Sequence, residues 1–432
     1  MNAAALTAAA SRALPVWRDP VAWAKAADIF AVLIALSLPW STSLVGIFVT
    51  IWLVTAAPML DFRLFLQSLK RPICAMPIAL FVLALVGTLW SDAPWGARLY
   101  ALSPAAKLLV LPLLFYRYER SARGGLWVFT AFLISCTLLM VASWVVALDP
   151  NISLKSAADA ARGIFVKNYI DQSQEFALCA IALAYPTITL LRAKKIWPAL
   201  LLFAIALSFA VNMTFVIVSR TAIVTMPIML AVFALLHLRW RTSFMIFGTV
   251  MVLAVAAWVV SPQLHRTTGT FFGEYRLYKE QNIPTSIGLR LEFWQKSLRF
   301  FAEAPIIGHG TGSTRGLFEL AATGASDQAT SQVIGNPHNQ TLNVAVQWGT
   351  AGIIVLYAMW LLHLLLFRGE GLVTWIGLLV VVQNIFTSLF NSHLFDFHEG
   401  WMYVLGVGIA GGMVLKARSA ERAGQSANPA RP

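Results

Sequence analysis

Charged residues are scarce in this chain. Only 12% of its 432 residues are Asp, Glu, Lys or Arg, whereas 59% are hydrophobic and the mean hydropathy is +0.72. Soluble domains carry about 25% charged residues, so the composition excludes an ordinary soluble globular domain as well as a disordered chain. The sequence therefore predicts a membrane protein that crosses the bilayer many times.

Cysteine is nearly absent too, with only three residues, Cys74, Cys136 and Cys179. All three fall inside apolar runs, so no pair of loop cysteines can form a disulfide framework. The first 25 residues lack an apolar core that ends in a cleavage site. We therefore expect an interfacial lead-in helix there and no cleaved signal peptide.

Apolar runs fill most of the chain, and a transmembrane helix needs roughly 17 to 25 such residues. Twelve candidate spans lie near residues 26–40, 43–58, 73–90, 99–116, 125–147, 173–191, 196–217, 220–238, 242–260, 349–367, 371–390 and 401–416. The pattern predicts an all-α fold with about 12 transmembrane helices. The first two runs are short, and a re-entrant pair is an alternative for them.

Lys and Arg alternate between successive loops, which indicates orientation through the positive-inside rule. Of the 32 basic residues, 19 precede the first span, follow an even-numbered span or lie in the C-terminal tail. Both termini are therefore predicted to be cytoplasmic, and the long segment 261–348 to face outward. The net charge of +13 reflects this topology and gives no indication of nucleic-acid binding.

The predicted organisation has four parts. Residues 1–260 form an N-terminal transmembrane bundle of nine spans, and 261–348 form a polar outer loop that we expect to carry the chemistry. Residues 349–418 form a C-terminal bundle of three spans. The polar, Pro-terminated segment 419–432 is expected to be a disordered cytoplasmic tail.

Within the outer loop, residues 287–302 have helical periodicity, with Leu291, Trp294, Leu298 and Phe301 three or four positions apart. Arg290 lies one turn before Trp294, at the edge of this apolar face, and is expected to point inward. The glycines 308, 310 and 312 that follow resemble a phosphate-binding loop in composition. Without a βαβ unit, however, a simple turn is the favoured interpretation.

The run Asn336, Pro337, His338, Asn339 predicts a helix start, with Asn336 as N-cap and Pro337 as first helical residue. His338 would then lie in the first turn, where the helix dipole keeps imidazole neutral and exposed N–H groups attract phosphate. A neutral base beside an anion site suits group transfer from a phosphate ester. The alternative is that His338 only caps the helix or contacts headgroups.

Arg220 lies at the boundary of two apolar runs with almost no loop between them. Arginine at membrane depth costs about 2.5–3.5 kcal/mol, so it needs a partner, and a phosphate is the natural one. The alternative is a side chain that extends to the lipid headgroups. Lys107, inside a span, likewise requires a polar neighbour. The ligand-type residues His393, Asp396, His398 and Glu399 match no zinc spacing, and we expect no metal site.

One combination of residues resembles a known family: Arg290, Trp294, Pro305, the glycines 308 to 312, then Pro337, His338, Asn339 and Gly349 to Gly352. It is similar to the signature of the O-antigen ligase and polymerase superfamily, and the order of the spans fits as well. Within the superfamily it looks most like the bacterial O-antigen ligases.

The resemblance implies a C-class glycosyltransferase-like fold and a metal-independent, cofactor-free, inverting glycosyltransferase of the bacterial inner membrane. The donor would be undecaprenyl diphosphate-linked O-antigen and the acceptor lipid A-core oligosaccharide, at the periplasmic face, completing lipopolysaccharide. Carried over to this chain, Arg220 and Arg290 would bind the donor diphosphate. His338 would act on the acceptor hydroxyl, as base or as its positioner.

Other functions stay open. An O-antigen polymerase or a protein O-oligosaccharyltransferase would share the fold and the chemistry with a different acceptor. A lipid-linked glycan transporter would require internal repeats and charged helices near the midplane, and neither is evident. No paired carboxylates suit a covalent glycosyl intermediate, although Glu292 is an alternative base.

Overall fold

The structure is a computed structural model that describes residues 19–427 except 123, 154 and 161. Within these residues every regular element is helical, as predicted for an all-α fold. The α-helices are α1 (Pro20–Ser37), α2 (Thr42–Ala56), α3 (Phe62–Leu69), α4 (Pro72–Val86), α5 (Trp95–Ala106), α6 (Val110–Arg120), α7 (Leu126–Leu148), α8 (Ala157–Ala160), α9 (Tyr169–Ala182), α10 (Ala184–Arg192), α11 (Ile196–Phe215), α12 (Arg220–His237), α13 (Trp240–Val260), α14 (Pro262–Gln281), α15 (Ser286–Glu303), α16 (Thr314–Leu320), α17 (Gln340–Leu366), α18 (Leu372–Thr387) and α19 (Phe397–Ala427).

The protein is a polytopic membrane protein. Among the described residues, ten helices or helix pairs are long and apolar enough to span a bilayer. The pair α3 and α4, bent by 83°, would be an eleventh span, and the shorter apolar helix α18 corresponds to the predicted run 371–390. All twelve runs of the sequence are thus helical. The first two, α1 and α2, belong to separate 18-residue candidates, each of which is long enough to cross alone.

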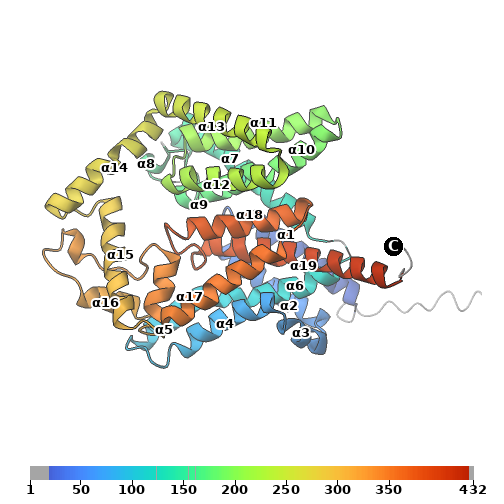
Figure 1. Ribbon diagram of the computed structural model, residues 1–432, viewed down its shortest axis with the longest axis horizontal. Coiled ribbons are helices and arrows are strands. Elements are labelled where there is room, and N and C mark those ends of the chain that lie inside the picture. The colour runs from blue at the N-terminus through green and yellow to red at the C-terminus, as the bar shows by residue number, and fades with distance from the viewer. Residues whose placement is uncertain (1–18, 123, 154, 161, 428–432) are drawn as a thin grey trace, which may run out of the picture.

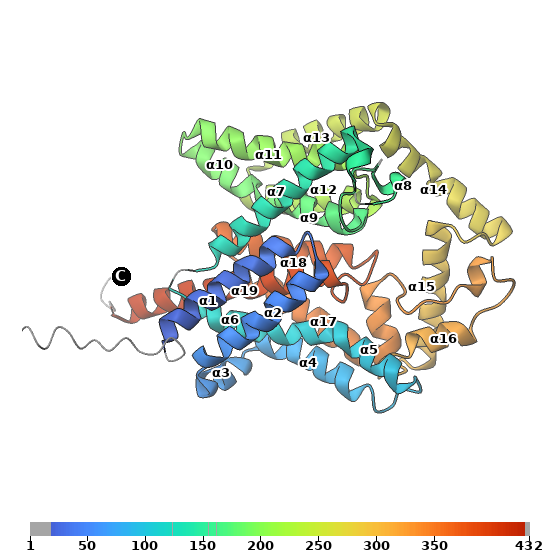
Figure 2. The same cartoon turned by 180° about the vertical axis from the view of Figure 1, so that it is seen from behind.

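The helices form two groups joined by an arm. Helices α7 to α13 lie together on one side, and α1 to α6 pack with α17 to α19 on the other (Figures 1 and 2). The arm consists of α14, α15 and α16 and runs from the end of α13 to the start of α17 at one end of the molecule (Figure 1). The predicted outer loop is therefore a helical bridge between the two groups.

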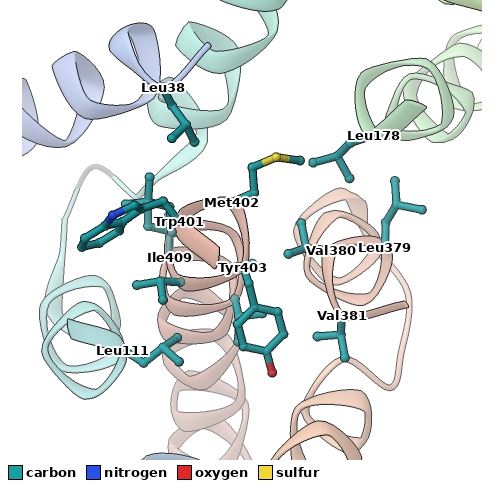
Figure 3. Close-up of a cluster of buried hydrophobic side chains, with 14 of the residues drawn as sticks. Leu38, Leu111, Leu178, Leu379, Val380, Val381, Trp401, Met402, Tyr403 and Ile409 are labelled. Atoms are coloured by element: carbon teal, nitrogen blue, oxygen red, sulfur yellow. The ribbon is translucent and has the colours of Figure 1, made fainter. Parts of the chain in front are cut away.

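Helix α19 is the centre of the larger group. Figure 3 shows Tyr403 and Ile409 of α19 among Leu111 of α6 and Val381 of α18. Within its candidate span, 78% of the residues are buried, against 6% for α13 at the edge. Lys107 has the polar neighbours that a lysine inside a span requires. Its ammonium donates to the backbone carbonyls of Phe395 and Asp396, just before α19.

The arm is fastened to the bundle by an exchange of backbone hydrogen bonds at Gly349. This residue breaks α17, with φ 59° and ψ −154°. The freed carbonyls of Val346 and Gln347 accept from the N–H groups of His309 and Gly310, at 2.9 and 2.8 Å. In return, the N–H groups of residues 350 and 351 donate to the carbonyls of residues 305 and 306, at 2.8 and 3.1 Å. These four backbone groups are thus paired across the joint.

The glycine-rich run serves this joint. Gly308 has a positive φ, and a Cβ added there would lie 2.5 Å from the backbone of Gln347 and Trp348. His309 contacts the carbonyl of Phe300 through Nε2 at 2.8 Å, so its ring is also used in packing. The interpretation of this run as a turn, and not as a phosphate loop, agrees with the structure.

One expectation differs from the structure. The tail was expected to be disordered from residue 419, but α19 continues through Ala427. The physical reason is composition, because the Ala-rich sequence with Glu and Arg has high helix propensity even without apolar packing. Residues 428–432 lie outside the described part of the chain. The predicted lead-in helix falls mostly on residues 1–18, which are also outside it.

Candidate functional site

An apolar pocket with two arginines lies between α12, α14 and α15. Its walls are formed by aliphatic and aromatic side chains, and Arg220 and Arg290 contribute its cations. The lining residues are Arg220, Thr221, Ile223, Val224, Thr268, Phe271, Phe272, Ile287, Arg290, Leu291, Trp294 and Phe390. Such a pocket can hold a ligand with an anionic head and an apolar chain.

Arg220 is the first residue of α12, and it has a protein partner that the sequence did not predict. Its guanidinium binds Glu274 of α14 through two hydrogen bonds, at 2.5 and 3.2 Å, and Thr270 through a third at 3.0 Å. The hydrogen bond from Arg220 is the main reason why the pKa of Glu274 lies below its ordinary value. A carboxylate therefore contacts the cation that we expected to bind phosphate.

Glu274 also binds the start of α15, since its Oε2 accepts a hydrogen bond of 3.2 Å from the backbone N–H of Ile287. The same carboxylate thus links three helices, α12, α14 and α15. Guanidinium groups and free N–H groups at a helix start are the donors that proteins use for phosphate. Glu274 occupies donors that would suit an anionic ligand.

Arg290 lies on α15, and the predicted helix over residues 287–302 is confirmed by the observed Ser286–Glu303. The face toward the bundle is formed by Phe293, Ser297 and Phe300, about one position away from the predicted face. Leu291 and Trp294 line the pocket instead, beside Arg290. The inward position of Arg290 therefore follows from the pocket face of α15.

No hydrogen bond or ion pair joins the Arg290 side chain to another described residue, in contrast to Arg220. Burial lowers the pKa of Arg290 from its ordinary value, and Tyr169 opposes that effect. An arginine nevertheless remains protonated at neutral pH. Arg290 thus offers a partly desolvated positive charge to the pocket.

His338 differs from the predicted position. The N-cap of α17 is Asn339, whose side chain accepts from Leu342 N, and the helix begins at Gln340. His338 precedes it with a left-handed φ of 54°. The Asn336 side chain accepts from the N–H of His338 at 3.0 Å and from the hydroxyl of Ser392 at 2.7 Å, so it stabilises a turn and not the helix.

The imidazole of His338 is nevertheless kept neutral, by a different cause. Burial lowers its pKa from the usual 6.5, a hydrogen bond with Asn391 raises it, and the charge of Arg290 lowers it. The ring lies 6.1 Å from that of Phe293, centroid to centroid.

The three predicted residues form a series and do not line a single pocket. Arg220 and Arg290 share the pocket, and the charge of Arg220 helps to lower the pKa of Arg290. His338 is not among the pocket residues, but Arg290 is close enough to lower its pKa. The charge of Arg290 thus acts on His338 from the pocket that it shares with Arg220.

Glu292, the alternative base, is engaged elsewhere. It is buried, accepts a hydrogen bond of 2.8 Å from the hydroxyl of Tyr278, and lies 3.4 Å from the ammonium of Lys296. Burial, followed by this hydrogen bond, raises the pKa of Tyr278 to about 12. Glu292 thus stabilises the packing of α14 against α15.

A second polar cluster lies in the loop before α19 and in the first turn of that helix. His393, Asp396 and Glu399 place one potential ligand atom each within 4.8 Å of one another, which is a group that could hold a metal ion. The ammonium of Lys107, however, already donates to the loop at Phe395 and Asp396. We therefore interpret the group as a network of charges, with no catalytic metal assigned.

No pattern in the sequence indicated Glu274 or Asn391 as site residues. Glu274 lies in an aromatic and charged stretch without clear periodicity, 54 residues after Arg220. Asn391 lies 53 residues after His338, in the loop between α18 and α19. Glu274 is the acidic residue nearest the middle of α14, but its presence there does not predict which residue it binds.

Comparison with known proteins supports the resemblance noted in the sequence. A search of curated proteins finds no match. Residues 202–357 match the family model described as O-Antigen ligase. This region contains Arg220, Glu274, Arg290 and His338, together with α12 to α16 and the broken first part of α17. The chain is thus similar, over residues 202–357, to the O-antigen ligase family.

Proposed function

We propose that this protein is an O-antigen ligase. It transfers a glycan from undecaprenyl diphosphate to lipid A-core at the periplasmic face of the bacterial inner membrane, and both termini are cytoplasmic. The observation that carries the proposal is the apolar pocket that Arg220 shares with Arg290, which has no hydrogen-bonding partner among the described residues and whose charge lowers the pKa of His338 outside the pocket.

The pocket fits the chemistry of a polyprenyl diphosphate. Two guanidinium groups can balance the charge of a diphosphate, and the walls at Ile223, Phe271 and Phe272 can contact the first isoprene units. As the sugar leaves, negative charge develops on the diphosphate oxygen. Arginines placed in a partly desolvated pocket stabilise that charge without a metal ion.

His338 then acts on the acceptor. Its Nε2 accepts the proton of the attacking core-sugar hydroxyl while the bond between that oxygen and the anomeric carbon forms. The bond from the anomeric carbon to the phosphate oxygen breaks at the same time, and undecaprenyl diphosphate leaves with the electron pair. Attack from the face opposite the leaving group inverts the anomeric configuration.

The test is reconstitution with purified protein in detergent. Lipid-linked glycan and lipid A-core are supplied in the presence of a chelator, and the products are separated on a gel. We expect a ladder of glycan-bearing lipid A-core. A requirement for added divalent metal would contradict the mechanism.

The alternative transferase functions differ in the acceptor of the glycan. In parallel reactions, lipid A-core is replaced by a second lipid-linked glycan or by a Ser-containing pilin. Transfer to the glycan alone would indicate an O-antigen polymerase, and transfer to the pilin alone a protein O-oligosaccharyltransferase. Movement of the lipid-linked glycan across vesicles without transfer would indicate a transporter.

A further inference from the structure

His338 is connected to a second side chain that the proposed chemistry does not yet use. Its Nδ1 lies 2.8 Å from Oδ1 of Asn391. The amide nitrogen of Asn391 in turn donates to Oδ2 of Asp396 at 2.7 Å. The three side chains form a chain of hydrogen bonds from the histidine to a carboxylate, all within or beside the loop between α18 and α19.

The direction of this chain follows from the groups themselves. In the structure the NH₂ of Asn391 donates to Oδ2 of Asp396, and the amide oxygen of Asn391 faces Nδ1 of His338. An amide oxygen only accepts, and Nδ1 of His338 must therefore carry the proton. A neutral imidazole with a proton on Nδ1 has its lone pair on Nε2.

We propose that Asn391 is a positioning residue for glycosyl transfer, which, oriented by Asp396, fixes the His338 tautomer that has a free Nε2 lone pair. This inference rests on the proposed function, because it specifies how the base of that reaction is prepared. When Nε2 takes the acceptor proton, Nδ1 keeps its own proton and still donates to Asn391. No further proton carrier is needed for the step.

The surrounding structure holds Asp396 in place for this role. The ammonium of Lys107 donates to the backbone carbonyls of Phe395 and Asp396, so both are fixed to the end of α5. The Ser392 hydroxyl donates to Oδ1 of Asn336, which also accepts from the N–H of His338. The loop that carries Asn391 and the turn that carries His338 are thus held together at two points.

The first test is Asn391→Ala. Without the amide oxygen, the two tautomers of His338 are both accessible and the ring can rotate, so we expect kcat to fall about 10- to 100-fold, as for other partners of a catalytic imidazole. The KM for lipid-linked glycan should stay within about twofold, because the pocket arginines are untouched. Asn384→Ala is the matched control, since this buried amide accepts from Trp360 at 3.2 Å and does not contact His338.

The second test is Asn391→Asp, which places a carboxylate against Nδ1. A negative charge there favours imidazolium, so kcat should recover relative to Asn391→Ala while the acid limb of the pH profile moves to higher pH. The other charged or titratable groups near His338 are Arg290 on α15 and His393 and Asp396 on the loop. Arg290 and His393 are unchanged in both variants, whereas Asp396, whose pKa burial raises to about 7, loses the hydrogen bond from Asn391 in both.

The outcomes separate this inference from the proposed function. Normal kcat in Asn391→Ala while His338→Ala is inactive would overturn the positioning role alone. Equal losses in Asn391→Ala and Asn384→Ala, without rescue or a pH shift in Asn391→Asp, would show a structural role and overturn it as well. Normal ligation by His338→Ala would overturn the proposed function first.

Discussion

The two ends of the candidate site hold their functional side chains in different ways. Arg220 and Arg290 face an open apolar pocket between α12, α14 and α15, and Arg290 has no hydrogen-bonding partner among the described residues. His338 is held by Asn391 and by the turn at Asn336. The difference fits the two tasks: a lipid-linked anion brings its own charge to the arginines, whereas a base must be oriented before its substrate arrives.

The largest expected effect is at His338, the side chain that hydrogen bonds hold in place. His338→Ala removes the proposed base, and general base catalysis contributes about 10²- to 10⁴-fold to rate. We expect kcat to fall by that factor while donor binding is retained, measured by gel-based ligation and by binding of lipid-linked glycan. His265→Ala, an exposed histidine on α14, is the control and should ligate normally. Loss of donor binding in His338→Ala would place the histidine at the wrong end of the site.

The next largest effect is expected in the pocket that Arg220 and Arg290 share. Arg290→Ala removes charge-assisted hydrogen bonds to the diphosphate, each worth about 1.5–3 kcal/mol, so the donor KM should rise about 10- to 150-fold. Arg290→Lys should recover only part of this, because an ammonium cannot bind two phosphate oxygens in a fork. Arg299→Ala, with an exposed ion pair on the same helix, is the matched control. An unchanged donor KM would remove Arg290 from the proposed diphosphate site.

The pH dependence of ligation tests the role of His338 without a mutation. A general base is active only when neutral, so activity should be present above the pKa of His338 and lost as the pH falls through it. Burial lowers that pKa below the usual 6.5, and we therefore expect full activity at pH 7 and a midpoint for the loss below 6.5. Measuring kcat between about pH 5 and 8 decides the point. A midpoint above 7 would mean that another group controls the rate.

The smallest expected effect concerns Glu274, the carboxylate that binds Arg220. Glu274→Gln removes a negative charge that competes with the donor for Arg220. A partly exposed ion pair contributes about 0.2–1 kcal/mol, so the donor KM should fall by up to about fivefold. Glu280→Gln on the same helix breaks only an exposed pair with Arg276 and should change nothing. A higher donor KM in Glu274→Gln would show instead that Glu274 holds Arg220 in its productive position.

Local patterns in the sequence predicted much of the fold. All twelve apolar runs are helical, and α15 was placed within one residue at each end. These predictions succeed because a helix in lipid must satisfy its own backbone, and an apolar run of sufficient length has few other options. Arg290 was found for the same reason, since helical periodicity alone places it beside Trp294 at the edge of one face.

The predictions that failed depended on contacts between distant residues. Asn336 and Asn339 are equally good N-caps by composition, and only the contact of Asn336 with Ser392 decides that the helix starts after Asn339. The phosphate expected for Arg220 stays a prediction, but its protein partner Glu274, on another helix, was not predicted. Nothing in the local sequence of either residue specifies these partners.

The sequence by itself determined that this chain is a helical membrane protein, which residues can carry charge at its outer end, and which superfamily it resembles. Hydrophobic length and residue type are local properties, so they can be read along the chain. The tertiary structure alone decided that α17 breaks at Gly349 to exchange hydrogen bonds with the arm, and that Asn391 fixes His338. These features arise where segments far apart in sequence pair their polar groups, because buried hydrogen-bonding groups must find partners wherever the fold brings them together.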